Sequence, residues 1–230
     1  MTAGAREGSL FVLLVTLGVT AAGGRAGAAQ VDQSDLQSRS GVRLNLTLPR
    51  KWEVDLDYQL RTVDDLSTYR GSYFTVETDY HLTKEITAIG AYRYFLGNEG
   101  NAHRFAAGLE LETKLHKVRL AFRPLIQYRT AFVDDGDVGG DGDTFARTRL
   151  RAEYPVTKKL DVYASVEPFF GFGGEYPVDN WRDEFGLQYA FTKGVRLDLY
   201  YIYRPDYGKA YNRTFHVVGV TLRFSKKVGG

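Results

Sequence analysis

Cysteine is absent from this 230-residue chain, which excludes a disulfide framework and any metal site built on thiolates. Methionine occurs once, at the initiator position, and proline is scarce. An excess of one charge sign is also lacking, because the chain has 30 Lys and Arg residues and 28 Asp and Glu residues. This balance argues against a protein that binds the phosphate backbone of nucleic acids. Tyrosine, phenylalanine and glycine are abundant instead, at 16, 14 and 25 residues, and this composition favours β structure over helices.

Long hydrophobic runs are lacking as well, except at the N-terminus. Arg6 precedes the apolar segment Leu10–Ala22, and Ala26-Gly27-Ala28 supplies the small residues that signal peptidase requires. The apolar segment is shorter than the ~20 residues of a membrane-spanning helix. We therefore predict a cleaved signal peptide over residues 1–28. Export to an oxidising compartment also suits a chain without thiols.

Alternation of apolar and polar residues dominates the rest of the chain. In the clearest segment, Trp52, Val54 and Leu56 alternate with Glu53 and Asp55. Period two is the spacing of a β-strand with two different faces. The same pattern predicts eleven strands, which lie at residues 41–48, 52–63, 72–82, 86–96, 102–115, 118–130, 144–154, 160–170, 182–191, 195–204 and 213–224.

The lengths of the strands and of their connections indicate a membrane barrel. Most of the predicted strands reach the ~9–11 residues of a tilted membrane strand, against ~5–6 in soluble proteins. Tight turns alternate with longer polar connections, a sorting typical of outer-membrane barrels. The turns lie at 49–51, 83–85, 116–117, 155–159 and 192–194, and the longer connections at 64–71, 97–101, 131–143, 171–181 and 205–212. We predict an all-β fold, an antiparallel up-and-down transmembrane β-barrel in the outer membrane of a Gram-negative bacterium; a soluble barrel is the alternative.

The strand count sets the domain boundaries. Bacterial single-chain barrels have even strand numbers, so the eleven clear strands favour a total of about 12. Residues 31–38 are then a poor twelfth strand, or else they thread the lumen. We accordingly predict an N-terminal segment at 29–40, the barrel over 41–225 and a C-terminal tail at 226–230.

Aromatic residues cluster near the ends of the predicted strands, on the apolar face. Amphipathic rings gather there when they sit at the two interfaces of a membrane. The predicted interface aromatics near the short turns are Trp52, Tyr80, Tyr154, Phe191 and Phe224. Those near the longer connections are Tyr94, Tyr128, Phe170 and Tyr203.

Short motifs along the barrel region resemble those of a known family. They are a strand that begins at Trp52 and reaches Leu60-Arg61, a Tyr92-Arg93-Tyr94 strand, and the later Glu167-Pro168-Phe169. They are similar to motifs in a family of bacterial outer-membrane β-barrels that is catalogued as a domain of unknown function. The resemblance covers about residues 35–225, and the tryptophan that this family carries near Arg39 is missing here. It implies a fold and a location, and it contributes no activity.

Charged residues fall on the opposite face, which would line the lumen. The predicted lumen charge network consists of Glu53, Asp55, Asp57, Glu77, Asp79, Glu110, Glu112, Arg119, Arg123, Arg129, Arg147, Arg149 and Arg151. An acidic wall opposite a basic wall creates a transverse field that can pass small polar solutes. In a narrow lumen, the same groups instead pair across the axis and close the pore. We expect Arg123 and Arg149 to pair with the acidic set and the lumen to be largely plugged.

Catalytic and metal-binding patterns are weak. The histidines, His81, His103, His116 and His216, show no His-x-Ser arrangement, so we predict no catalytic residues and no enzymatic activity. Residues 134–143 carry five aspartates among glycines: Asp134, Asp135, Asp137, Asp141 and Asp143. Flexible oxygen ligands of this kind suit calcium, but the spacing is not that of an EF-hand, and a solvated loop is the interpretation we favour. We predict no metal site and no cofactor.

The sequence therefore predicts the cellular location of the protein more specifically than its activity. We expect an integral outer-membrane barrel with a structural or surface-interaction role and an extracellular ligand that the sequence does not identify. A small, weakly selective diffusion channel is the alternative, and an outer-membrane lipid-modifying enzyme is a further one. The expected partners are outer-membrane lipids and the barrel-assembly machinery, without nucleic acid.

Overall fold

The computed structural model describes residues 33–98, 100–130, 132–134, 137–139, 142–172, 178, 180–206 and 213–229. The predicted signal peptide over residues 1–28 lies outside the described residues. No helix within the described ranges is both long and apolar enough to cross a membrane.

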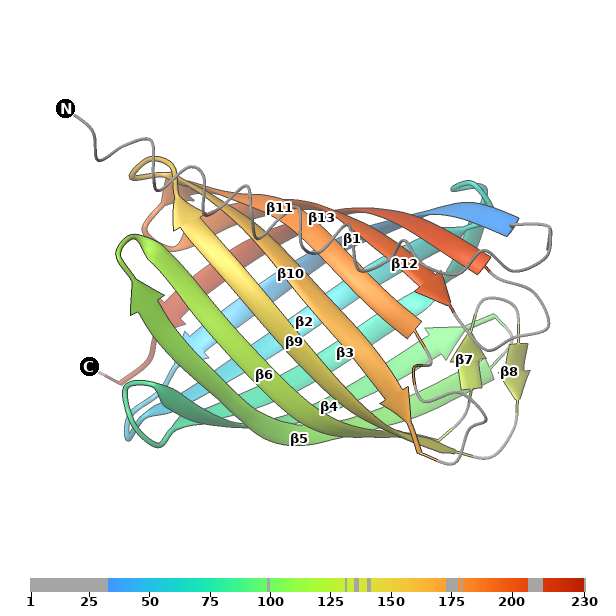
Figure 1. Cartoon of the computed structure of the whole chain (residues 1–230), viewed down its shortest axis with the longest axis horizontal. Coiled ribbons are helices and arrows are strands. Elements are labelled where there is room, and N and C mark those ends of the chain that lie inside the picture. The colour runs from blue at the N-terminus through green and yellow to red at the C-terminus, as the bar shows by residue number, and fades with distance from the viewer. Residues whose placement is uncertain are drawn as a thin grey trace. The chain divides into compact units, whose positions relative to one another are not determined.

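Eleven long strands among the described residues form one closed barrel (Figure 1). In chain order they are β1 (Gln33–Thr47), β2 (Trp52–Val63), β3 (Thr68–His81), β4 (Ile86–Gly97), β5 (Gly100–Leu115), β6 (Val118–Arg129), β9 (Asp143–Pro155), β10 (Leu160–Gly171), β11 (Asn180–Thr192), β12 (Val195–Asp206) and β13 (Arg213–Lys227). Each pairs with its chain neighbour in antiparallel register, and β6 pairs with β9. The short strands β7 (Phe132–Asp134) and β8 (Asp137–Gly139) pair with each other. The predicted barrel architecture is confirmed.

The barrel closes through a parallel pair. β1 runs alongside β13 from Gln33↔Arg213 to Thr47↔Lys227. In an up-and-down barrel with an odd number of strands, the first and last strands run in the same direction, so the closing pair must be parallel.

A separate twelfth strand at 31–38 is therefore wrong, because residues from Gln33 onward belong to β1. The predicted boundaries at 41 and 225 likewise fall inside β1 and β13. Alternation misses the start of β1 because its sequence is polar on both faces. Backbone pairing with β13 on one side and β2 on the other holds this segment in place.

The connections define two ends of the barrel. At the turn end lie the short connections 48–51, 82–85, 116–117, 156–159 and 193–194. At the opposite end, the loop end, two of the predicted long connections are short: residues 64–67 join β2 to β3, and residues 98–99 join β4 to β5. The strands extend into residues predicted as loop because cross-strand backbone hydrogen bonds continue beyond the apolar alternation. Three positive φ angles, at Asp64, Asp65 and Leu66, make the tight turn between β2 and β3 possible.

The apolar side chains face outward and the charged ones face inward. Leu56 and Leu109 are both 40% exposed on the outer surface, whereas Asp198 is 2% exposed inside. The predicted interface aromatics divide between the ends: Trp52, Tyr80, Tyr154, Phe191 and Phe224 lie toward the turn end, and Tyr94, Tyr128, Phe170 and Tyr203 toward the loop end. Trp52 and Tyr80 pack against each other across β2 and β3, with ring centroids 4.8 Å apart. The fold is thus polar inside and apolar outside.

Candidate functional site: the charged lumen

A cavity of about 440 Å³ occupies the interior of the barrel, and inward-facing charged side chains line it. The predicted lumen residues that line it are Asp55, Asp57, Glu77, Asp79, Glu110, Glu112, Arg119, Arg123, Arg147, Arg149 and Arg151. Glu53 lies outside this lining, with its Oε1 3.3 Å from His81 Nε2 at the turn end. Arg129 lines a second cavity, of about 100 Å³, toward the loop end.

Arg123 links strands that are not neighbours in the sheet. Its Nη2 lies 2.5 Å from Glu77 Oε2, and its Nη1 lies 3.9 Å from Glu110 Oε2. Arg149 Nη2 approaches the same Glu110 oxygen at 3.5 Å. Because β4 and β5 separate β3 from β6, the contact with Glu77 crosses the interior of the barrel. The predicted pairing of Arg123 and Arg149 with carboxylates of the acidic set is thus present in the geometry.

Other arginines pair with carboxylates on the same strand or on an adjacent one. Arg147 donates two hydrogen bonds to Glu167 Oε1, from Nε at 3.0 Å and from Nη2 at 2.6 Å. Arg43 Nε lies 3.1 Å from Asp57 Oδ2. Glu153 accepts hydrogen bonds from both Arg119 and Arg151. These charge-assisted contacts fix the guanidinium groups against the wall of the lumen.

A second group centres on Tyr163, a residue that was not among the predicted lumen residues. The Tyr163 hydroxyl lies 2.8 Å from Glu184 Oε1 and 3.1 Å from Asp198 Oδ1, and Arg223 Nη2 lies 2.5 Å from Asp198 Oδ2. Opposite Tyr163 on β11 stands Gly186, where an added Cβ would lie 2.4 Å from the tyrosine ring. The feature of the sequence that could have revealed this contact is Gly186 within a strand, because a glycine there often marks a place where another group closely approaches the backbone.

Replacing Tyr163 with phenylalanine is expected to destabilise the barrel by ~1–3 kcal/mol, because the buried Asp198 and the half-buried Glu184 lose the hydroxyl donor that they share. Gly186→Val is expected to cost more, since the new side chain would displace the tyrosine ring as well. Gly90→Ala is a matched control, because the nearest atom to an added Cβ there is 3.4 Å away. Unfolding in guanidinium measures all three variants, and equal stability of Tyr163→Phe and the wild type would contradict this assignment.

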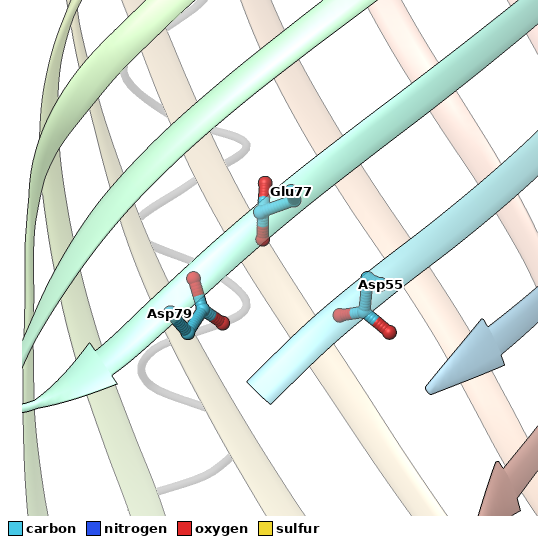
Figure 2. A group of neighbouring side chains, drawn as sticks. All are labelled: Asp55, Glu77 and Asp79. Carbon is cyan, nitrogen blue, oxygen red and sulfur yellow. The ribbon is translucent and has the colours of Figure 1, made fainter. Parts of the chain in front are cut away.

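Three carboxylates converge near the turn end, as Figure 2 shows for Asp55, Glu77 and Asp79. One oxygen of each lies within 4.8 Å of the others, and such oxygens are ligands that divalent cations prefer. Glu77 is already bound to Arg123, and Asp55 Oδ1 accepts a hydrogen bond from Asn45. Glu77 therefore belongs to the ion-pair network, whereas Asp79 Oδ1 has no hydrogen-bond partner among the described residues.

The aspartate-rich segment 134–143, predicted as a solvated loop, falls largely outside the described residues. The side chains of Asp134, Asp135, Asp137 and Asp141 are not among those described. Asp143 is described, and its Oδ2 accepts a hydrogen bond from Arg129 Nη2 at 2.9 Å. This aspartate thus belongs to the lumen wall at the loop end.

His81 lies between a carboxylate and a hydroxyl, an order that invites comparison with a catalytic triad. Its Nε2 faces Glu53, and its Nδ1 lies 2.9 Å from Thr87 Oγ1. All three residues lie within the ladders of β2, β3 and β4, which commit their backbone groups to sheet hydrogen bonds. His103 lines the smaller cavity toward the loop end. The Nδ1 atoms of His103 and His216 contact the hydroxyls of Tyr92 and Tyr201.

Carboxylates and arginines are distributed unevenly along the axis. The carboxylates Glu53, Asp79 and Glu112 lie toward the turn end. The loop half contains an arginine cluster, formed by Arg39, Arg61, Arg93, Arg104 and Arg182. Charged runs along single strands do not reveal this cluster, because its members come from five different strands. The charge of the lumen therefore differs between the turn end and the loop end, in addition to the predicted difference between its two walls.

Comparisons with known proteins bear on the fold and the family. A family model described as "Protein of unknown function (DUF2490)" matches residues 40–215. No curated protein matches the chain. A solved structure with the description "NanC porin structure in rhombohedral crystal form" has a similar fold, with a TM-score of 0.50 at 13% sequence identity. The match covers 74% of this chain and 86% of that chain.

Proposed function

The chain belongs to the DUF2490 family of proteins of unknown function, and we propose that it is an integral outer-membrane β-barrel with a lumen largely closed by ion pairs. Its role in this proposal is structural or one of interaction at the cell surface, and it involves no catalysis. The observation that carries the proposal is the ion pair of Arg123 with Glu77, which crosses the interior of a closed barrel.

The outer surface supports the membrane location. Large apolar side chains such as Leu56, Leu109 and Phe122 are exposed there, where water would make such a continuous surface unfavourable. Aromatic residues lie toward both ends, as at the two interfaces of a bilayer. In this proposal, outer-membrane lipids cover the surface and the barrel-assembly machinery inserts the chain.

The ion pairs support closure. Arg123 and Glu77 are only 13% and 22% exposed, so neither presents a freely hydrated charge to a passing solute. Arg149 and Glu110 extend the contact on the same side of the lumen. Fixed pairs in a narrow barrel fill the cross-section and leave little room for ion flow.

A small diffusion channel is the second candidate, and the cavity of about 440 Å³ favours it. Water in this volume could connect the two ends if the pairs around Arg123 exchange partners. The two candidates differ in conductance, since the channel conducts in its resting state and the closed barrel does not.

Fractionation and conductance measurements test the proposal. We expect the protein in the outer-membrane fraction, and we expect heated and unheated samples to migrate differently on a gel, as folded barrels do. We also expect little conductance in planar bilayers. Recovery from the soluble periplasm without heat-modifiable migration would refute the membrane assignment. Steady conductance of the wild type would favour the diffusion channel instead.

A further inference from the structure

The arginine cluster in the loop half combines like charges at directly opposed positions. Arg39 is the cross-strand partner of Arg61, and Arg93 is the partner of Arg104. Side chains at directly opposed positions lie within about 5.5 Å at their Cβ atoms, and like charges there destabilise a sheet. An arginine cannot lose its proton to relieve this repulsion. Two such pairs in one part of the lumen therefore require compensation from elsewhere.

Carboxylates do not supply this compensation among the described residues. Arg61 and Arg93 donate from Nε to neutral groups, Gln59 Oε1 and Thr75 Oγ1, each at 2.7 Å. Arg39 is 6% exposed, and its Nε and Nη2 have no hydrogen-bond partner among the described residues.

Glu167 is the only carboxylate that contacts the cluster within the described ranges. It lies 4.0 Å from Arg182 Nη1, and Arg147 already holds its other oxygen at 2.6 Å. Among the described residues, the cluster thus keeps donors and positive charge that no carboxylate satisfies.

The cluster faces the space where a ligand could lie. Arg61, Arg93, Arg104 and Arg182 line both the large cavity and the smaller one of about 100 Å³ toward the loop end. Planar guanidinium groups bind carboxylates through two parallel hydrogen bonds, which gives them geometric selectivity over a simple point charge.

Aromatic rings complete the smaller cavity and indicate an organic ligand. Tyr73, Phe95, Phe145 and Phe169 line this cavity together with the arginines. The Arg61 guanidinium lies 3.8 Å from the centre of the Tyr73 ring, and that of Arg182 lies 4.3 Å from the centre of the Phe169 ring. These stacked contacts hold the guanidinium planes in place. The site therefore offers charge for an acid group and apolar surface for the body that carries it.

We propose that the arginine cluster binds small organic acids that enter from the loop end, with their carboxylate between Arg93 and Arg104. The inference rests on the proposed surface barrel, and it names the class of ligand that such a barrel would take. The ion pairs around Arg123 would then lie beyond the bound acid, between it and the turn end.

Benzoate is a suitable probe, and benzamide is its uncharged counterpart of the same size. Calorimetric titration of the purified full-length barrel in a nonionic detergent measures both. We expect saturable binding of benzoate and no measurable binding of benzamide. Binding of both compounds with equal affinity, or of neither, would overturn the proposal.

The double variant Arg93→Gln/Arg104→Gln tests the site itself. It is expected to weaken benzoate binding by about tenfold or more, because both charge-assisted donors are lost. The unfolding temperature should stay the same or rise, because a pair of like charges is removed. Arg196→Gln is the matched control: it removes one charge near the turn end, where Arg196 lies 3.7 Å from Asp161, and it should leave benzoate affinity unchanged.

The possible failures are distinguishable. Unchanged benzoate affinity in the double variant would overturn the inference, and so would a fall in unfolding temperature that accounts for the lost binding. An outer-membrane barrel of low conductance that does not bind benzoate would leave the proposed function intact. A soluble protein would refute the proposed function whatever its affinity for benzoate.

Discussion

Replacing both Arg123 and Arg149 with alanine is expected to lower the unfolding temperature and to open a conductance several times that of the wild type. The two arginines lie side by side on β6 and β9 and contact Glu77 and Glu110, so their removal widens the lumen and leaves both carboxylates without these partners. Removal of one partner from a buried ion pair costs ~3–5 kcal/mol. We expect the lower part of this range, because the cavity admits water around the remaining carboxylates.

Single-channel recording and thermal unfolding measure the two effects separately. Arg196→Ala is the control, because this arginine is 47% exposed near the turn end and its loss should change neither quantity much. The opened lumen of the double variant should select cations, since Glu77 and Glu110 then carry unopposed negative charge. If the wild type already conducts steadily and the variant changes only ion selectivity, the lumen is a water-filled channel and the closed-barrel proposal fails.

Leu109→Arg is expected to cost ~2–4 kcal/mol of barrel stability, the penalty for an arginine that faces lipid near the middle of a membrane strand. Leu109 is 40% exposed on the outer face of β5, and Leu56→Arg on β2 should behave in the same way. Unfolding by guanidinium in lipid vesicles measures the loss. The expected size depends on a lipid environment, so the same variant in a water-soluble barrel would lose much less.

Two controls separate charge from position. Leu109→Ala removes the side-chain volume without adding charge, and it should cost less than the arginine. Glu112→Gln changes an inward residue of the same strand that lines the lumen, and it should affect stability little. Asp57 and Glu110 are unsuitable controls, because they hold Arg43 and Arg123. Equal losses on the outward and inward faces would contradict the assignment of the outer face to lipid.

Alternation predicted most of the barrel because a strand between two unlike environments must repeat every two residues. Strand β2 was predicted at its observed bounds, Trp52–Val63. The first strand was predicted too short, since hydrogen bonds to β2 and β13 hold the polar residues after Gln33. Backbone bonds of this kind are independent of side-chain type, so no residue pattern reveals them.

The inward direction of the Arg123 and Arg149 side chains could likewise be predicted, because each residue lies on a strand with alternating apolar and polar residues. The partner that each arginine contacts depends on strand order, tilt and register around the closed barrel. The role of Tyr163 was missed because the contacts of its ring depend on the space above Gly186 on the next strand. The arginine cluster was missed because Arg39 and Arg104 are single charges on separate strands.

By itself, the sequence determined that this chain forms long two-faced strands, with charge on one face and apolar side chains on the other. It determined this because the period-two pattern is a local property of each strand. Only the tertiary structure decided that eleven strands close through the parallel pair β1 and β13. Closure also decided that Arg123 meets Glu77 across the lumen. This contact joins residues far apart in the chain, and register around a closed sheet fixes it.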